Sequence, residues 1–216
     1  MGGSRKGRRI ALADSGLLIV VSGPSGAGKG TICDALRARF PQVHYSISMT
    51  TRPPRPGEKE GVNYYFTDTA HFEALLAQDA FLEHAKVYDH YYGTPKQYVY
   101  DALARGEHVL LEIDIQGAMQ VRKHYPQCLC VYIVPPNRQV LAARLHGRHT
   151  DSEEVIAGRL QKTQAELAWM KEYDYVIVND RLAAAIEQME AIIRAEACRC
   201  ARNGNTLSRI CAAYQE

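Results

Sequence analysis

Residues Leu17-Leu-Ile-Val-Val-Ser22, followed by Gly23-Pro-Ser-Gly-Ala-Gly28-Lys29-Gly30-Thr31, decide the fold of this chain. The first six are mostly apolar and predict a strand that is buried on both faces. The next nine fit the pattern GxxxxGK of a phosphate-binding loop. The apolar spacing of Ile32, Ala35 and Leu36 then predicts a helix. A strand, a glycine-rich turn and a helix in this order predict a site for nucleotide phosphates.

Each part of this motif has a physical task. Glycines let backbone N–H groups crowd around an anion without Cβ clashes, and the positive end of the helix dipole lies at the same point. Lys29 adds a compact charge that reaches the β- and γ-phosphates. Serine or threonine usually follows the lysine as a Mg²⁺ ligand, but here Gly30 follows it and the first hydroxyl comes at Thr31. We therefore expect Mg²⁺ to be held mainly by water and the nucleotide.

Four further short apolar runs alternate with helical patterns along the chain. Most of them are continuously apolar, as in strands that crossover helices cover on both faces. The alternation predicts an α/β fold with a mostly parallel sheet between two layers of helices. The four runs are His44–Ser48, Val109–Ile113, Leu129–Val134 and Tyr175–Val178, and the predicted core comprises residues 16–49, 100–143 and 156–216.

Two stretches interrupt this alternation, and a tail precedes it. Residues 50–99 hold four of the nine prolines and many tyrosines, and we interpret them as an inserted substrate-binding lobe. Residues 144–155 are polar and rich in arginine and histidine, which predicts a mobile lid. The lid ends in Thr150-Asp-Ser-Glu153, a pattern typical of a helix start. Residues 1–15 begin as a basic, glycine-rich stretch that predicts a flexible tail without the apolar segment of a signal peptide.

Composition and charge exclude several other classes of protein. The net charge of +2 over 216 residues is too small to indicate nucleic acid or a membrane as the main partner. The longest apolar run, Cys128 to Val134, is far too short to span a bilayer. The six cysteines form no CxxC pair, so we expect reduced thiols, mostly in the core or at helix contacts, in a cytosolic protein without a cysteine metal site.

The predicted strand Val109–Ile113 carries Glu112 near its end and is followed by Asp114. In a parallel sheet the carboxyl ends of the strands meet at one edge, which is also where the phosphate loop lies. Carboxylates at that edge can orient the water molecules around Mg²⁺. Thr31 and Asp114 are therefore the candidate protein ligands of the ion.

Further motifs, given at the end of this paragraph, follow the phosphate loop. Together with it they resemble the guanylate kinase family over roughly residues 17 to 200. The resemblance implies a P-loop kinase core with a GMP-binding lobe at 50–99 and a short lid at 144–155. It also implies transfer of the γ-phosphoryl group of ATP to GMP and to dGMP. The motifs are Ser48-Met-Thr-Thr-Arg52-Pro-Pro-Arg55-Pro-Gly-Glu58, Gly61-Val-Asn-Tyr64-Tyr-Phe66, Phe81-Leu-Glu83-His-Ala85, Tyr91-Tyr92-Gly93-Thr94, Asp114-Ile-Gln-Gly117, Asp151-Ser-Glu-Glu154 and Glu172-Tyr-Asp-Tyr-Val-Ile-Val-Asn179-Asp180.

The resemblance also implies roles for individual positions. Lysine and arginine residues would surround the transferring phosphoryl group: Lys29, Arg52, Arg148 and Arg159, with Arg144 as a further lid arginine. ATP would be bound by Gly23, Pro24, Ser25, Gly26, Ala27, Gly28, Lys29, Gly30, Thr31 and Asn179. GMP would be bound by Ser48, Arg52, Arg55, Tyr64, Glu83, Tyr92, Gly93, Thr94 and Asp114.

Physical chemistry supports the roles assigned on the GMP side. Arg52 and Arg55, in a proline-stiffened loop, can form a fork for a phosphate dianion. Guanine has paired donors at N1 and N2, which the carboxylate of Glu83 can accept, and adenine has no such pair. A wrong base would leave that carboxylate buried and unpaired, so we expect strong discrimination. The acceptor phosphate is already anionic, and no protein nucleophile or general base is expected.

Two alternatives remain at this point. One is a phosphosugar kinase on the same scaffold, against which Ser48, Glu83 and Thr94 argue, because a sugar has no guanine edge. The other is a non-catalytic guanylate-kinase-like interaction module, against which Lys29 and the lid arginines argue. The predicted partners are ATP and GMP, with Mg²⁺ as cofactor, no nucleic acid and no membrane. The oligomeric state stays open, and the predicted location is the cytoplasm.

Overall fold

The computed structural model describes residues 16–87, 89–147 and 152–215. Its core is a parallel sheet with the strand order β2-β7-β1-β8-β9. β1 lies in the middle, paired in parallel with β7 and β8, and it leads directly into the phosphate loop. The predicted α/β fold is therefore confirmed. The strands are β1 (Leu18–Ser22), β2 (Val43–Tyr45), β7 (His108–Glu112), β8 (Leu129–Val134) and β9 (Tyr175–Val178).

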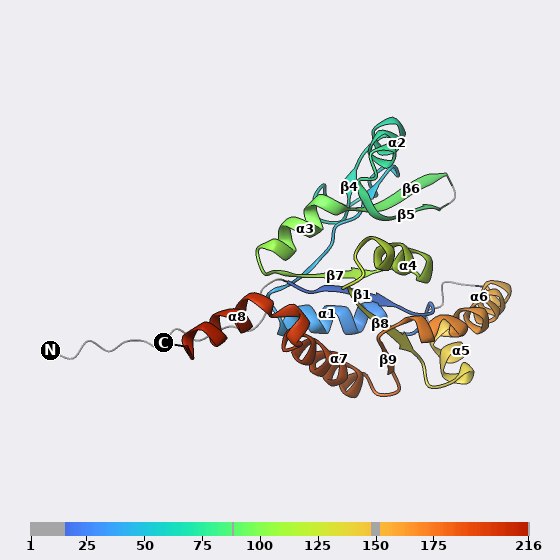
Figure 1. The fold of residues 1–216 in the computed structure, drawn as a ribbon. Coiled ribbons are helices and arrows are strands. Elements are labelled where there is room, and N and C mark those ends of the chain that lie inside the picture. Colours follow the sequence, from blue (N-terminus) through green and yellow to red (C-terminus); the bar gives the residue numbers. More distant parts are fainter. Residues whose placement is uncertain (1–15, 88, 148–151, 216) are drawn as a thin grey trace.

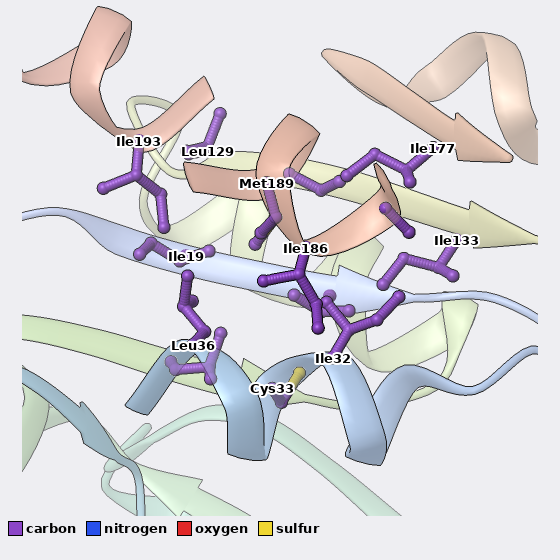
Figure 2. Packing of buried hydrophobic residues seen from close by; sticks show 14 of the residues in the cluster. Ile19, Ile32, Cys33, Leu36, Leu129, Ile133, Ile177, Ile186, Met189 and Ile193 are labelled. Carbon is purple, nitrogen blue, oxygen red and sulfur yellow. The ribbon is translucent and has the colours of Figure 1, made fainter. Parts of the chain in front are cut away.

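Helices cover both faces of this sheet, which gives three layers (Figure 1). Alternate residues of β1 face two separate apolar cores, because successive side chains of a strand point to opposite faces. Ile19 packs with Ile32, Ile186 and Met189 on one face, as Figure 2 shows, whereas Val20 belongs to the core on the other face. The helices of the first face are α1 (Lys29–Arg39) and α7 (Leu182–Ala197), and those of the second are α3 (Lys96–Ala104) and α4 (Ile115–His124).

Burial on both faces explains why the central strand is continuously apolar. All of β1 is buried, and burial of each large aliphatic side chain contributes about 1.5–3 kcal/mol. The edge strand β9 differs, because Val176 and Val178 are exposed while Ile177 is buried. The phosphate loop therefore starts from the most firmly packed strand of the molecule.

A second sheet of four short strands, the small sheet, lies on the α4 side of the core (Figure 1). Phe72 stacks on Phe81 and Tyr91, at centroid distances of 4.4 and 5.2 Å, and forms its apolar centre. Gln120 of α4 exchanges hydrogen bonds of 3.0 and 3.1 Å with the backbone of His84, which ties the small sheet to the core. The elements are β3 (Met49–Thr50), β4 (Tyr65–Phe66), β5 (Phe81–Val87), β6 (His90–Pro95) and α2 (Thr69–Ala77), and the strand order is β4-β3-β6-β5.

The remaining elements follow β8. They are α5 (Arg138–His146), α6 (Glu153–Glu166), the 3₁₀ helices η1 (Leu167–Glu172) and η2 (Cys200–Arg202), and α8 (Gly204–Ala213). The side chain of Ser152 caps α6 by accepting from the backbone N–H of Val155. The predicted boundaries at 99, 143 and 155 fall inside or at the edges of helices α3, α5 and α6. The division into core, lobe and lid stays a prediction, and the tail at 1–15 and the lid residues 148–151 lie outside the described residues.

Two details differ from the sequence prediction. The run His44–Ser48 was predicted as a strand, but β2 spans Val43–Tyr45, since pairing with β7 ends at Tyr45 and the chain then leaves for the small sheet. The cysteines were expected mostly in the core or at helix contacts, and Cys33, Cys128 and Cys130 are buried, whereas Cys198, Cys200 and Cys211 are exposed. All three come after α7, the last helix that packs on the large sheet. No helix in the described ranges has both the length and the apolar character that crossing a bilayer requires.

Candidate active site

The phosphate loop, residues 23–31, has a backbone that depends on its glycines. Gly26 and Gly28 adopt φ angles of +88° and +89°, a left-handed conformation that side chains disfavour. A Cβ at Gly23 would lie 1.9 Å from the backbone oxygen of Ile133. The ammonium of Lys29 donates to the backbone oxygens of Gly23 and Pro24 at 2.7 and 3.1 Å. The lysine therefore lies folded over the loop that it completes.

Asn179, directly after β9, supports the loop from the side. Its Nδ2 donates to the backbone oxygen of Ala27 at 2.8 Å, and it would lie 2.4 Å from a Cβ at Gly28. Arg144 of α5 donates from Nη2 to the backbone oxygen of Asn179 at 2.8 Å. Oδ1 of Asn179 and Nη1 of Arg144 are buried, and the described residues offer neither of them a hydrogen-bond partner. Beside the loop, Nη1 of Arg144 is therefore an unpaired donor and Oδ1 of Asn179 an unpaired acceptor.

A cavity of about 670 Å³ lies over the phosphate loop at the carboxyl edge of the sheet. Arg159 of α6 reaches it and donates to the hydroxyl of Ser25 at 3.2 Å. Lys162 and Glu166, one and two helical turns further along α6, also line the cavity, and sequence reasoning missed both. Their spacing from Arg159 on one predicted helix was the available signal. The remaining lining residues come from the loop, the end of β7 and α6: Gly23, Gly26, Gly28, Lys29, Gly30, Thr31, Glu112, Ile113, Asp114 and Thr163.

Side chains whose oxygen atoms could bind Mg²⁺ line this cavity: Thr31, Glu112 and Asp114. The phenol of Tyr45 donates to Glu112 at 3.1 Å, and the carboxylate oxygens of Glu112 would lie 3.6 and 3.8 Å from a Cβ at Gly30. The side chain of Asp114 accepts from the backbone N–H of Gly117 at 2.9 Å and caps α4. Carboxylate and hydroxyl oxygens suit Mg²⁺, but no cluster of three or more metal-ligating side chains occurs in the part of the chain that the structure describes. These oxygen groups fit a Mg²⁺ ion that is held mainly through water molecules and the nucleotide.

Glu83 lies on β5, and it is largely buried. The hydroxyl of Thr94 on β6 donates to Glu83 at 2.6 Å. Burial raises the pKa of Glu83, the hydrogen bond from Thr94 lowers it, and the nearby charge of Asp114 raises it further. Gly93 next to Thr94 permits this packing, because a Cβ there would lie 2.8 Å from the ring of Phe81. A buried carboxylate with one partner retains acceptor capacity for a ligand.

The start of α4 joins the two sides of the site. A Cβ at Gly117 would lie 3.2 Å from Oε2 of Glu83 and 3.5 Å from Oδ1 of Asp114. Asp114 in turn lines the cavity over the phosphate loop. The buried carboxylate of the small sheet and the phosphate cavity of the core therefore meet at one helix terminus.

Arg52 and Glu58 form an ion pair within the loop after β3. The guanidinium of Arg52 donates from Nη2 to both oxygens of Glu58, at 2.9 and 3.0 Å, and lies 5.5 Å from the ring centroid of Tyr64. Tyr92 packs against Tyr64 at 6.0 Å. The bond from Arg52 and the backbone N–H of Arg55 lower the pKa of Glu58. Glu58 had no predicted role, although its charge opposite to the two arginines in the same short loop was a usable signal.

The structure brings most of the predicted residues to these two places. Arg52, Tyr64 and Tyr92 are together, Glu83 and Thr94 are together, and the loop residues surround the cavity with Arg159. Ser48 is half-buried just before β3, and the side chain of Arg55 is exposed beside the loop. Arg148 lies outside the described residues.

A three-layer α/β core with a glycine-rich phosphate loop after its central strand, a charged cavity and a second small sheet defines a P-loop nucleotide kinase. Residues 15–196 match the family model of guanylate kinase. The guanylate kinases of Carboxydothermus hydrogenoformans and Desulfitobacterium hafniense are 55% and 50% identical to this chain, over 84% and 87% of it and 89% and 94% of their own lengths. A crystal structure of guanylate kinase from Anaplasma phagocytophilum matches 89% of this chain and 92% of its own, with 31% identity and a TM-score of 0.69. The chain belongs to the guanylate kinase family.

Proposed function

We propose that this protein transfers the γ-phosphoryl group of ATP to GMP, giving ADP and GDP, and that it also accepts dGMP. The observation that carries the proposal is the meeting of two unlike sites at the start of α4. Asp114 lines the phosphate cavity and its charge acts on the buried carboxylate of Glu83, and a Cβ at Gly117, one turn later, would lie 3.2 Å from that carboxylate. A nucleotide whose base pairs with Glu83 would thereby present its phosphate toward the cavity.

ATP would occupy the cavity over the phosphate loop. Backbone N–H groups of residues 23–31 and the start of α1 would bind its β-phosphate, as helix N-termini bind anions. Lys29 would exchange its contacts with Gly23 and Pro24 for phosphate oxygens. The adenine amino group can donate to the orphaned Oδ1 of Asn179. Arg159, already beside Ser25, would contact the transferring group together with Arg148 of the lid.

GMP would lie between the small sheet and α4. Glu83, Thr94 and Ser48 would read the guanine edge, and Met49 after Ser48 pairs with Gly93 before Thr94. Arg52, Arg55, Tyr64 and Tyr92 would bind the GMP phosphate. The bidentate pair of Arg52 with Glu58 orients the guanidinium before the ligand arrives, which lowers the entropic cost of binding.

Phosphoryl transfer needs positioning and charge neutralisation more than covalent chemistry. Lys29, Arg52 and Arg159 supply positive charge around the transferring group. Mg²⁺, held by ATP and by water molecules that Thr31, Glu112 and Asp114 would orient, neutralises phosphate charge when it is bound. Closure of the lid would exclude water and so limit ATP hydrolysis. The GMP phosphate attacks directly, and no side chain has to remove a proton from it.

The two alternatives are less well supported. A phosphosugar has no donor pair for the buried carboxylate of Glu83, which would then stay desolvated without compensation. A protein-interaction module has no use for the charged cavity with Lys29 and Arg159. The cytoplasmic location, the absence of nucleic-acid and membrane partners and the dGMP activity remain parts of the proposal.

A coupled assay of ADP release tests the proposal. The purified protein is given MgATP and, in turn, GMP, dGMP, AMP, CMP and UMP, with GDP identified as product by chromatography. We expect rapid turnover with GMP, slower turnover with dGMP and almost none with the others. Absence of GDP under these conditions contradicts the proposed function, and equal rates with AMP contradict the role of Glu83.

A further inference from the structure

Two cysteines lie against each other on the sheet edge opposite the phosphate loop. Cys128 directly precedes β8 and Cys130 is its second residue, and their sulfur atoms are 3.4 Å apart. Both side chains are buried, at 4% and 0% exposure. The phosphoryl-transfer site uses neither of them, because they lie at the start of β8 while the cavity lies at the ends of the strands.

A carboxylate and a guanidinium, from Asp174 and Arg122, lie beside this pair. The carboxylate of Asp174 accepts from the backbone N–H of Cys130 at 2.7 Å and from Nη2 of Arg122 at 2.8 Å. Nε of Arg122 is buried and has no hydrogen-bond partner by distance and angle among the described residues, and the guanidinium interacts with the Cys130 thiol. An unpaired guanidinium N–H beside two thiols would be satisfied by a sulfur anion or by an oxygen added to the sulfur.

The electrostatics distinguish the two thiols. The hydrogen bond from Cys128 lowers the pKa of Cys130 most, Arg122 lowers it further, and burial and Asp174 act against them. The hydrogen bond to Cys130 and burial raise the pKa of Cys128. These two directions favour a negative charge on Cys130 rather than on Cys128 when the pair loses one proton.

The pair lies beside a cavity. Cys128 lines this cavity of about 470 Å³ between the turn at Pro126 and the segment around Arg199 and Gly204, and the sulfur of Cys130, which does not line it, lies 3.4 Å from that of Cys128. Asp174, which accepts from the backbone N–H of Cys130, also lines the cavity. A molecule as small as hydrogen peroxide can enter such a space, whereas a protein partner cannot.

We propose that Cys128 and Cys130 form a peroxide-reactive thiol pair, in which Cys130 reacts with a hydroperoxide and Cys128 then closes a reversible disulfide. In the first step the Cys130 sulfur attacks one peroxide oxygen, the O–O bond breaks, and the second oxygen leaves as water. The Cys128 sulfur then attacks the sulfenic sulfur, the S–O bond breaks, and another water leaves. With hydrogen peroxide, two thiols and one peroxide give one disulfide and two water molecules.

Formation of the disulfide takes a local movement. The sulfurs must approach from 3.4 Å to about 2.05 Å. Cys128 lies outside β8, and its backbone N–H bonds to the oxygen of Tyr125 in a turn. This turn residue can move toward Cys130, whose backbone is held by pairing with Val20 of β1 and by the bond from the N–H of Asp174 to its oxygen.

The chain offers an internal control for reactivity. Cys33 is equally buried, but burial and then the charge of Glu112 raise its pKa to about 12, and it lacks a second cysteine as neighbour in the described structure. The exposed Cys198, Cys200 and Cys211 would obscure the result. The test protein is therefore the full chain with these three replaced by serine.

This protein is treated with hydrogen peroxide, quenched with catalase, denatured and analysed by thiol count and intact mass. We expect loss of two of the three thiols and a mass decrease of about 2 Da, reversed by dithiothreitol, with Cys33 still reduced. The proposal is wrong if the pair keeps its thiols, or if Cys33 is oxidised as fast as the pair. Peptide mapping of the wild-type chain gives the same answer should the triple variant fail to fold.

Single substitutions in this background test the assigned roles. With Cys128→Ser, a sulfenic acid on Cys130 should persist and be trapped by dimedone, whereas with Cys130→Ser, trapping at Cys128 should be much slower. Arg122→Gln should slow oxidation of the pair roughly tenfold, the effect of about one pKa unit on the thiolate population. Arg105→Gln, which removes another ion-paired surface arginine, is the matched control. Equal trapping at both cysteines, or no effect of Arg122→Gln, overturns the assignment.

Discussion

The phosphate loop and the small sheet both present positive charge toward a proposed phosphate, but they hold it by different means. The loop starts from β1, which is buried throughout, and its shape depends on glycines with positive φ and on Asn179. The small sheet has strands as short as two residues, and Arg52 is oriented by a side chain, Glu58. Backbone N–H groups on a rigid core bind any phosphate, while side chains on a separate sheet can select one base.

In both regions, oxygen atoms of the protein itself accept hydrogen bonds from the cation that is proposed to bind phosphate. The ammonium of Lys29 donates to two backbone oxygens, whereas the guanidinium of Arg52 donates to the carboxylate of Glu58 and to the backbone oxygen of Pro53. The difference predicts that changes in the loop alter the chemical step, whereas changes in the small sheet alter recognition of GMP. The following four experiments test this division.

The largest effect is expected for Lys29→Ala. Turnover should fall on the order of 10²–10³-fold or more, because charge developing on the transferring group loses its closest cation. Binding of GMP, measured by calorimetry, should be unchanged. Lys171→Ala, an exposed lysine of η1, is the control. Normal turnover of the Lys29 variant would end the assignment of the loop as the ATP site.

Glu83→Gln should act on recognition. The kcat/KM for GMP should fall roughly 10- to 100-fold, because a charge-assisted pair to guanine is lost, while that for AMP should stay unchanged. The KM for ATP is measured in parallel and should not move. Glu73→Gln on α2 is the matched control within the same region. If the ratio of GMP to AMP activity is unaltered, Glu83 does not read the base.

Glu58→Gln should give a smaller change. Arg52 would lose its bidentate anionic partner and sample more orientations, so the KM for GMP should rise about 3- to 10-fold with little change in kcat. Glu60→Gln in the same segment serves as control. A lower KM for GMP would show instead that Glu58 competes with the phosphate, and that Arg52 is masked rather than oriented.

The smallest effect is a pH dependence confined to the GMP side. Burial raises the pKa of Glu83 above its ordinary value of 4.5. GMP binding requires the carboxylate, so GMP affinity should fall as the pH drops through the raised pKa, and ATP affinity should not. A carboxyl group whose pKa is raised in the folded state stabilises the fold at pH values below its ordinary pKa. This stabilisation is lost as the pH rises through the raised pKa. Chemical unfolding at several pH values should show this trend in the wild type and not in Glu83→Gln.

Local patterns in the sequence were sufficient for the large sheet and the phosphate loop. The strands β8 and β9 coincide with the predicted runs Leu129–Val134 and Tyr175–Val178. Such strands are predictable because burial on both faces demands unbroken apolar runs. The small sheet was not predicted in this way: β3 and β4 have two residues each and leave no periodicity to detect, and the longer strands β5 and β6 lack a continuous apolar run.

The sequence by itself determined the α/β class, the phosphate loop and the residue types of both sites, because these depend on local spacing and on motifs. Only the tertiary structure decided that Glu58 holds Arg52, that Asn179 supports Ala27, and that Glu83 meets Asp114 at the start of α4. It also placed Cys128 against Cys130 and beside Asp174 and Arg122. Most of these contacts join segments that are distant in the chain, and their energies depend on burial and on partners that no local pattern encodes.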